Sequence, residues 1–350
     1  MGCGSKLAPP QWSPDGTKLA VGNGSVLEIW SGVRNGEQPS RELTIQANSY
    51  IHSIAWNPQG DRIAIVHDAL EVWELPSVTL LYRVYAHGNY ITEVSWRADG
   101  TQIATASADR TLKIWDAGTG VVTQTMTVLR RDMNLPVSEI FVVPTSVRWQ
   151  SDESLLIFGV ADGTVRLWDT EELNAAEVRT TALDPRVMST GSTGDVRIES
   201  VDVNDFDGEI VSGAGDGTLT VWDIDTSEVL RSFQTNLSLD SVSYSQFGGR
   251  LLISGGQASD NGIERHVILN ESLLNGGVQI VVPDPSLERL QSIAELCNAP
   301  LTVADAIPDA TQTDQLADFI TQVESLPADS IPPACAADLI AVAEAIQAGQ

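Results

Sequence analysis

Two kinds of tryptophan-containing segment recur along the chain, and their spacing restricts the possible folds more than any other feature. The first is Trp12-Ser13-Pro14-Asp15-Gly16, a tryptophan ahead of a turn, and it returns in related form at Trp56, Trp96 and Trp149. The second is a tryptophan that is usually followed by an acid. Its five copies are separated by 43, 42, 53 and 54 residues: Trp30, Trp73, Trp115, Trp168 and Trp222. A period of about 40–45 residues is typical of four-stranded units repeated around an axis, with insertions in the two longer intervals.

The residues between these tryptophans have the pattern of short β-strands joined by tight turns. In the third unit we expect strands from Ile91 to Trp96, Gln102 to Ser107, Thr111 to Trp115 and Thr123 to Val128. Each run is rich in β-forming residues, and Asp99-Gly100 between the first two is a hairpin signal. The repeat therefore predicts an all-β fold built from antiparallel sheets.

The third unit also resembles the WD40 repeat family, with His87-Gly88 upstream, Asp109 in a turn and Trp115-Asp116 at the end. The resemblance covers about residues 7–282 and implies a WD40-type β-propeller. It further implies a buried hydrogen-bond relay of His87, Thr105, Asp109 and Trp115. Such a network stabilises a fold when each of its polar groups has a partner.

The other units keep this pattern unevenly. The fifth has Ser212, Asp216 and Trp222 but no matching histidine, and the fourth has Phe158 where a hydroxyl is expected. The sixth retains two strands and has lost its Trp-acid pair. We predict a propeller of six recognisable blades, with a truncated seven-bladed ring as the alternative.

Composition changes after residue 283. We therefore divide the chain into a propeller, residues 1–283, and an acidic helical C-terminal segment, residues 284–350. Amphipathic patterns predict three helices in that segment: Ser286 to Cys297, Asp314 to Leu326 and Ala334 to Gln347. Cys297 and Cys335 lie at two of the predicted helix ends. We expect them to be free thiols, with a disulfide as the alternative if the third helix returns antiparallel to the first.

The charge balance restricts the partners. With 47 acids and 20 bases the net charge is −27, which argues against a nucleic-acid partner because phosphate binding needs clustered positive charge. No apolar stretch is long enough to span a membrane. The first residues lack the apolar core of a secretory signal, so we expect a cytoplasmic location, with an exported or lipid-anchored protein as the alternative.

We find no catalytic, cofactor-binding or metal-binding pattern. The histidines are His52, His67, His87 and His266, and no motif of a nucleophile, a base and an orienting acid accompanies them. We therefore predict a non-enzymatic scaffold for a protein or peptide partner, without a cofactor. The alternative is a propeller hydrolase or a ligand-binding sensor with its site in the central channel.

Two long insertions are the candidate recognition elements, from Leu129 to Val143 and from Ala182 to Val196. Both are expected to connect a fourth strand to the next blade's first strand, and thus to emerge on one face, where loops on a rigid scaffold often bind partners. Four arginines in or beside them are the candidate partner-binding residues: Arg130, Arg131, Arg179 and Arg186. The alternative is that these arginines pair with the protein's own acids.

Overall fold

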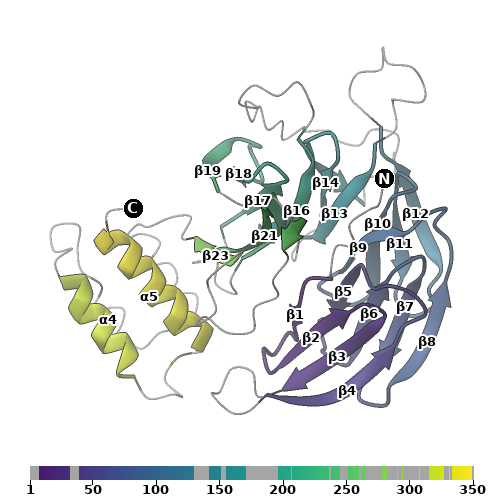
Figure 1. Ribbon diagram of the computed structural model, residues 1–350, viewed down its shortest axis with the longest axis horizontal. Helices are drawn as coiled ribbons and strands as arrows, with labels where there is room; N and C mark the ends of the chain where they lie inside the picture. Colours follow the sequence, from purple (N-terminus) through teal and green to yellow (C-terminus); the bar gives the residue numbers. More distant parts are fainter. Residues whose placement is uncertain are drawn as a thin grey trace.

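The β-rich part of the chain forms six antiparallel sheets among the residues that the structure describes. The computed structural model describes residues 8–31, 39–129, 142–150, 155–170, 196–205, 207–235, 238–244, 251–259, 262–264 and 278–281 of this part. In the C-terminal part it describes residues 290, 294, 307, 315–326, 331 and 333–348. Figure 1 shows the sheets following one another around an arc in chain order.

The first three sheets are four-stranded, and each follows chain order. The first contains β1 (Gln11–Trp12), β2 (Lys18–Asn23), β3 (Val26–Ser31) and β4 (Ser40–Gln46). The second contains β5 (Ser53–Trp56), β6 (Arg62–Val66), β7 (Leu70–Glu74) and β8 (Thr79–Val84). The third contains β9 (Ile91–Trp96), β10 (Gln102–Ser107), β11 (Thr111–Asp116) and β12 (Val122–Thr127).

The fourth sheet has three described strands, the fifth again has four in chain order, and the sixth departs from that order. The fourth contains β13 (Pro144–Trp149), β14 (Leu155–Val160) and β15 (Val165–Asp169). The fifth contains β16 (Ile198–Asn204), β17 (Glu209–Ala214), β18 (Thr218–Asp223) and β19 (Val229–Gln234). The sixth contains β20 (Ser238–Tyr244), β21 (Leu251–Ser259) and β22 (Gly262–Glu264), with β23 (Val278–Val281) also paired to β21.

The arrangement is that of a WD40-type β-propeller, as the sequence predicts. The first strands of consecutive sheets pack side by side: β1 with β5, β5 with β9, β9 with β13, β13 with β16, and β16 with β20. In the fifth sheet burial falls toward the last strand: all residues of β17 are buried, whereas those of β19 are exposed or partly buried. The six-bladed ring stays a prediction, because it depends on how the last sheet meets the first.

The recurring turn after the first tryptophan requires glycine. Gly100 has a φ of +74°, and Gly16 and Gly60 take similar positive values at the same place in their sheets. This left-handed conformation is open to glycine at little cost, whereas a side chain would strain the turn. In the first three sheets these turn glycines help to set the register of the first two strands.

The acid after the second tryptophan closes the following turn. Asp116 Oδ1 accepts hydrogen bonds from the backbone nitrogen and the hydroxyl of Thr119, at 2.8 and 2.7 Å. Asp223 receives the same pair of bonds from Thr226 at 2.7 and 2.8 Å. A short carboxylate that binds backbone two or three residues ahead stabilises a tight turn. The Trp-Asp pair therefore combines a core ring with a turn anchor.

The tryptophan before the first turn joins neighbouring blades. Trp56 Nε1 donates to the carbonyl of Gln11, and Trp96 Nε1 donates to the carbonyl of Ala55, each at 3.1 Å. In the fourth sheet the buried Trp149 Nε1 has no partner among the described residues, and the Arg97 guanidinium lies 5.6 Å from its ring centroid. The hydrogen bond from this tryptophan to the preceding blade therefore forms in the second and third sheets. In the fourth sheet a cation–π contact with Arg97 takes its place.

Ion pairs continue the connection between the later blades. Arg148 on β13 contacts Glu93 on β9 at 2.5 Å and Asp202 on β16 at 3.4 Å. Asp202 in turn accepts a 2.8 Å hydrogen bond from the backbone nitrogen of Tyr244 on β20. Four consecutive blades are thus linked along their first strands.

The C-terminal segment has a core of its own. It contains α4 (Leu316–Glu324) and α5 (Pro333–Ala348), which confirm the second and third predicted helices. Of the first predicted helix only Leu290 and Ala294 are described, and both are helical. These two residues share one buried cluster with Phe319, Cys335 and Leu339. The division of the chain at residue 283 stays a prediction.

The expectation of free thiols in this segment was wrong for Cys335, which is disulfide-bonded. Its partner, one of the two other cysteines, lies outside the described residues. Cys335 is completely buried in the cluster that also holds Ala294, three positions before Cys297. Which cysteine is the partner stays a prediction.

Candidate functional site

One end of the sheets collects the connections between blades, and we call it the loop face. Its described residues are 47–52, 67–69, 85–90, 108–110, 128–129, 142–143, 161–164, 196–197 and 215–217. Backbone hydrogen bonds tie each connection to a turn of a neighbouring strand pair, as in Ile91 N to His67 O at 2.6 Å and Val128 N to Arg110 O at 2.9 Å. The face therefore stands on a rigid hydrogen-bonded base.

The described ends of the two predicted insertions meet at this face. The carbonyl of Val143 accepts a 2.9 Å hydrogen bond from Ala161 N, in the turn between β14 and β15. The backbone of Val196 approaches Gly163 in the same turn so closely that a Cβ there would lie 2.7 Å from the Val196 oxygen. The C-terminal ends of both insertions, at Val143 and Val196, therefore lie beside the same turn between β14 and β15.

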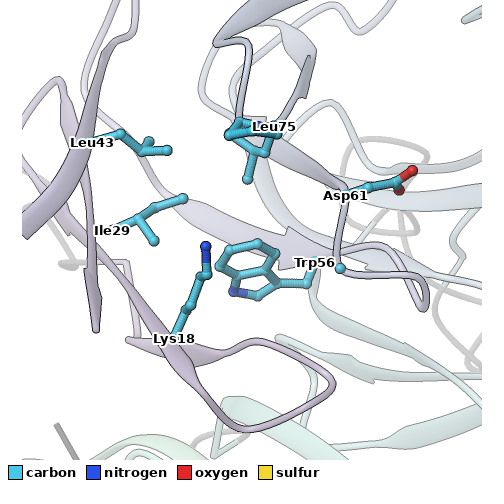
Figure 2. A pocket seen from close by; sticks show the side chains of 8 residues that line it. Lys18, Ile29, Leu43, Trp56, Asp61 and Leu75 are labelled. Carbon is cyan, nitrogen blue, oxygen red and sulfur yellow. The ribbon is translucent and has the colours of Figure 1, made fainter. Parts of the chain in front are cut away.

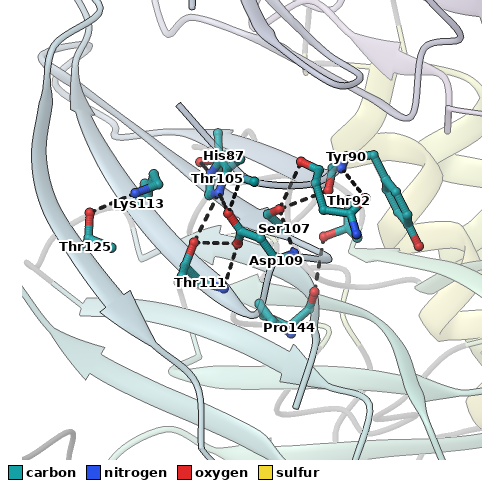
Figure 3. A network of polar contacts seen from close by, with 12 residues as sticks. His87, Tyr90, Thr92, Thr105, Ser107, Asp109, Thr111, Lys113, Thr125 and Pro144 are labelled. Atoms are coloured by element: carbon teal, nitrogen blue, oxygen red, sulfur yellow. Dashed lines mark hydrogen bonds and ion pairs between the residues drawn. The ribbon is translucent and has the colours of Figure 1, made fainter. Parts of the chain in front are cut away.

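The four predicted relay residues come together beneath the loop face in the third sheet, and Figure 3 shows three of them, His87, Thr105 and Asp109. Trp115 Nε1 donates to the hydroxyl of Thr105 at 2.8 Å, and that hydroxyl lies 2.8 Å from His87 Nε2. His87 Nδ1 lies 2.9 Å from a carboxylate oxygen of Asp109. One direction of donation satisfies every contact: indole to hydroxyl, hydroxyl to imidazole, and imidazole to carboxylate.

Asp109 anchors the outer end of this chain. Its carboxylate also accepts from the backbone nitrogen of Gly88 at 2.8 Å and from the Thr111 hydroxyl at 2.6 Å. Although burial opposes it, hydrogen bonds from Thr111, Gly88 and His87 lower the pKa of Asp109 to about 2. Burial lowers the pKa of His87 despite its bond to Asp109, which favours a neutral imidazole.

The order Thr105, His87, Asp109 is superficially that of a nucleophile, a base and an orienting acid. Two observations exclude a nucleophilic role for Thr105 in this geometry. Its side chain is fully buried, and its hydroxyl already engages both the indole and the imidazole. No substrate can reach the oxygen without unfolding the sheet, so the arrangement is suited to holding strands together.

The relay is only partly repeated elsewhere. In the fifth sheet Trp222 Nε1 donates to Ser212 Oγ at 3.0 Å, whereas Asp216 accepts a 2.9 Å bond from the backbone nitrogen of Thr218 in its own turn. The structure therefore brings Ser212 and Trp222 together and leaves Asp216 as a turn residue. In the fourth sheet Phe158 is buried in the position where a hydroxyl was expected.

A second buried polar network, in the second sheet, was missed by the sequence analysis. Trp73 Nε1 donates to Glu71 Oε2 at 2.8 Å, and Glu71 Oε1 contacts His67 Nε2 at 2.9 Å and Arg83 Nε at 2.7 Å. Burial would lower the pKa of His67, but hydrogen bonds to Glu71 and Asp68 raise it above its usual value. One difference in the sequence marks the position, since Glu71 lies two residues before the repeat tryptophan where the third unit has Lys113, but it does not indicate the partners of Glu71.

The four arginines that the sequence marks as partner-binding, Arg130, Arg131, Arg179 and Arg186, lie outside the described residues. Their pairing with a partner or with the protein's own acids stays a prediction.

A pocket of about 210 Å³ opens at the opposite end of the first two sheets (Figure 2). Ile29, Leu43, Trp56 and Leu75 line it. Its charged lining residues are engaged within the protein: Lys18 pairs with Glu42 at 2.7 Å, and Asp61 accepts a 2.6 Å bond from Asn57. The pocket is smaller than the 300–1,000 Å³ that is usual for sites that bind drug-sized ligands.

The described residues contain neither a metal-binding cluster nor a membrane-spanning helix. No group of histidine, cysteine, aspartate and glutamate side chains in that part of the chain is placed to hold a metal ion. No helix in it is long and apolar enough to cross a membrane.

Comparison with known proteins identifies the repeat. Residues 78–116, 139–169 and 185–223 match the WD40 family, described as WD domain, G-beta repeat. The COMPASS component SWD3 of Saccharomyces cerevisiae is 27% identical over 233 residues, covering 66% of this chain and 69% of that protein. The guanine nucleotide-binding protein subunit beta of Arabidopsis thaliana is 22% identical over 291 residues, covering 78% and 72%. The human serine-threonine kinase receptor-associated protein is 28% identical over 172 residues, covering 49% and 42%.

Proposed function

The chain is a WD40 repeat protein, and we propose that it acts as a non-enzymatic scaffold that docks a protein or peptide on its loop face. The observation that carries the proposal is the meeting of both insertions at the turn between β14 and β15, above sheets locked together by buried polar contacts. Loops that are held side by side on a rigid base are a common way to build a recognition surface.

The similar proteins support the docking part of the proposal. Their names describe members of assemblies: a component of COMPASS, a subunit of a guanine nucleotide-binding protein and a receptor-associated protein. The shared fold does not transfer their partners to this chain. The net charge of −27 favours a protein partner over a nucleic acid, because the polyanionic backbone would be repelled.

The partners of three histidines support the proposal that the scaffold is not an enzyme. His52 is hydrogen-bonded to the carbonyl of Ile91, His67 lies between two carboxylates, and His87 belongs to the relay. In the described residues none of these three is aligned with an accessible nucleophile. No observation in these residues favours the alternative of a hydrolase or a sensor with a site in the central channel.

The disulfide of Cys335 favours the exported alternative over a cytoplasmic location. Disulfides persist in oxidising compartments and are rare in the cytosol, where thiols are kept reduced. We therefore propose that the chain works in an oxidising compartment.

A photo-crosslinking experiment tests the docking face. A benzophenone amino acid is placed at Tyr85, whose side chain is 59% exposed on the loop face, or at the exposed Gln59 in a turn at the opposite end. We expect one partner band from position 85 of the full chain, captured from its native extract, and none from position 59. Crosslinking from position 59 alone would move docking to the opposite end. A hydrolytic activity of the purified chain would overturn the scaffold proposal.

A further inference from the structure

Three aromatic rings form a row on the loop face between the second and third sheets. The ring centroids of Tyr50 and His52 are 6.0 Å apart, and those of His52 and Tyr90 are 5.1 Å apart at an interplanar angle of 61°. Tyr50 and His52 lie in the connection that leads to β5, and Tyr90 lies in the connection that leads to β9. All three residues are partly exposed to solvent.

The backbone holds this row in place. His52 Nδ1 donates to the carbonyl of Ile91 at 3.0 Å, and His52 N donates to the carbonyl of Val66 at 2.9 Å. The ring of Tyr90 extends away from the relay, as Figure 3 shows. The two loops are also joined by a 3.4 Å hydrogen bond from Asn48 to the hydroxyl of Tyr85. The rings are therefore positioned before any partner arrives.

The row carries no positive charge of its own at neutral pH. Burial lowers the pKa of His52, although its bond to the Ile91 carbonyl acts in the opposite direction. A neutral imidazole between two phenol rings presents electron-rich faces, which attract cations.

A carboxylate stands close to the rings. The side chain of Asp68, in the turn between β6 and β7, is 60% exposed and accepts a 2.5 Å hydrogen bond from His67 Nδ1. Its negative charge is near enough to His52 to affect the pKa of that imidazole. An exposed carboxylate beside aromatic faces is a surface that suits an ammonium or guanidinium group.

We propose that the row of Tyr50, His52 and Tyr90, together with the carboxylate of Asp68, receives a lysine or arginine side chain from a basic segment of a partner protein. The chain has 47 acids and 20 bases, and its net negative charge adds long-range attraction for such a segment. The inference rests on the proposed docking function and names the chemistry of the partner. It concerns a different part of the loop face from the arginine-bearing insertions, and the two are tested separately.

Peptide binding by the full-length protein tests this proposal. The probe is a short fluorescein-labelled peptide of alternating glycine and lysine, and its fully acetylated counterpart is the matched uncharged control. Fluorescence anisotropy is measured at about 0.15 M ionic strength, where exposed charges are screened beyond about 8 Å. We expect the lysine peptide to bind and the acetylated peptide not to bind. Equal affinity for both peptides, or no binding of the lysine peptide, would overturn the proposal.

Two pairs of variants separate the aromatic row from general attraction to an acidic protein. Tyr90→Leu removes a ring face and should weaken binding of the lysine peptide about threefold to tenfold, whereas Tyr90→Phe keeps the ring and should bind as wild type. Asp68→Asn should weaken binding more than Asp99→Asn, which removes the same charge at a 48% exposed side chain at the opposite end of the sheets. Equal effects of the two aspartate variants, with none from Tyr90→Leu, would show diffuse attraction only.

The same variants distinguish this inference from the docking proposal. Crosslinking of the native partner from position 85 that persists unchanged in Tyr90→Leu overturns the role of the aromatic row and leaves the docking face intact. Loss of that crosslinking in Tyr90→Leu but not in Tyr90→Phe supports both.

Discussion

The indole nitrogen of Trp73 donates its hydrogen bond to a fully buried carboxylate, Glu71, at 2.8 Å. The corresponding tryptophan of the next blade, Trp115, donates to the hydroxyl of Thr105 at the same distance. In both blades the indole N–H of the repeat tryptophan thus has an acceptor, and only that of Trp115 belongs to a fully buried ring. In the second blade the acceptor is a charge, and that charge is balanced by His67 and Arg83.

Replacing Glu71 by glutamine should destabilise the protein. The amide keeps the shape of the side chain but removes the charge that His67 and Arg83 face, at a cost on the order of 2 kcal/mol. Urea unfolding at pH 7, followed by tryptophan fluorescence, measures the difference. Lys113→Gln, at the equivalent and partly exposed position of the third sheet, is the control and should leave the midpoint nearly unchanged. Equal midpoints for wild type and Glu71→Gln would contradict the assignment.

The same pair of proteins should respond differently to acid. Although burial opposes it, hydrogen bonds from His67, Arg83 and Trp73 lower the pKa of Glu71 from 4.5 to about 2. A carboxyl with a depressed folded pKa stabilises the fold above its unfolded pKa and loses that contribution as the pH falls through the folded value. The wild type should therefore lose stability between pH 4.5 and about 2, by up to about 3 kcal/mol from this group. The advantage of the wild type over Glu71→Gln should shrink as the pH is lowered from 5 to 3. An advantage that stays constant over that range would contradict the lowered pKa.

Asp109→Ala should also destabilise the protein, by on the order of 1–3 kcal/mol, because it leaves His87 Nδ1 and the Gly88 amide without their acceptor. Thermal unfolding gives the comparison. Asp99→Ala, in an exposed turn of the same sheet, removes a similar carboxylate and should cost less. If Asp109→Ala unfolds at the wild-type temperature, the relay does not contribute to stability.

The repeat made the sheets and the relay predictable from the sequence. In the third unit β9 and β10 have the expected bounds, because turn glycines and alternating strands fix the register locally. The position of Glu71 was not predictable in the same way. Its charge is balanced by Arg83 on the neighbouring strand and by His67 after β6, and the spacing of Glu71 to a tryptophan indicates neither partner.

Contacts between strands far apart in the chain were also not predictable from the sequence. Glu93, Arg148 and Asp202 are separated by more than fifty residues each, and nothing in their local sequences indicates that they form one chain of ion pairs. The aromatic row has the same character, since Tyr50 and Tyr90 belong to connections of different blades. Such juxtapositions follow from blade packing, which a repeat pattern does not specify in detail.

Charge reversal tests the arginines of the insertions. Changing Arg130, Arg131 and Arg186 to glutamate should abolish capture of the partner while leaving the unfolding temperature unchanged, if these residues bind an acidic segment. The alternative pairing with the protein's own acids predicts the opposite result: a lower unfolding temperature and unchanged capture. The single reversals Arg130→Glu and Arg41→Glu change the net charge equally, so Arg41, whose side chain is 53% exposed on β4, is the matched control for charge.

Thiol titration tests the disulfide and its partner. Cys335 is disulfide-bonded, so the unfolded, unreduced protein should titrate one of its three thiols with Ellman's reagent, and the reduced protein should titrate three. Titration of three thiols without reduction would exclude the bridge. The cytoplasmic location would then be preferred over an oxidising compartment.

Single variants then identify the second sulfur. Because Ala294 and Cys335 share one buried cluster, we expect Cys297 to be the partner. The unreduced Cys297→Ser protein should therefore titrate two thiols, whereas unreduced Cys3→Ser should titrate none. The Cys297–Cys335 bridge would close a loop of about forty residues, so its loss should destabilise the C-terminal segment by roughly 3–4 kcal/mol. Hydrogen exchange in α5 with and without reductant measures that loss. If Cys3→Ser titrates two thiols and Cys297→Ser none, the bridge instead joins the N-terminal residues to α5.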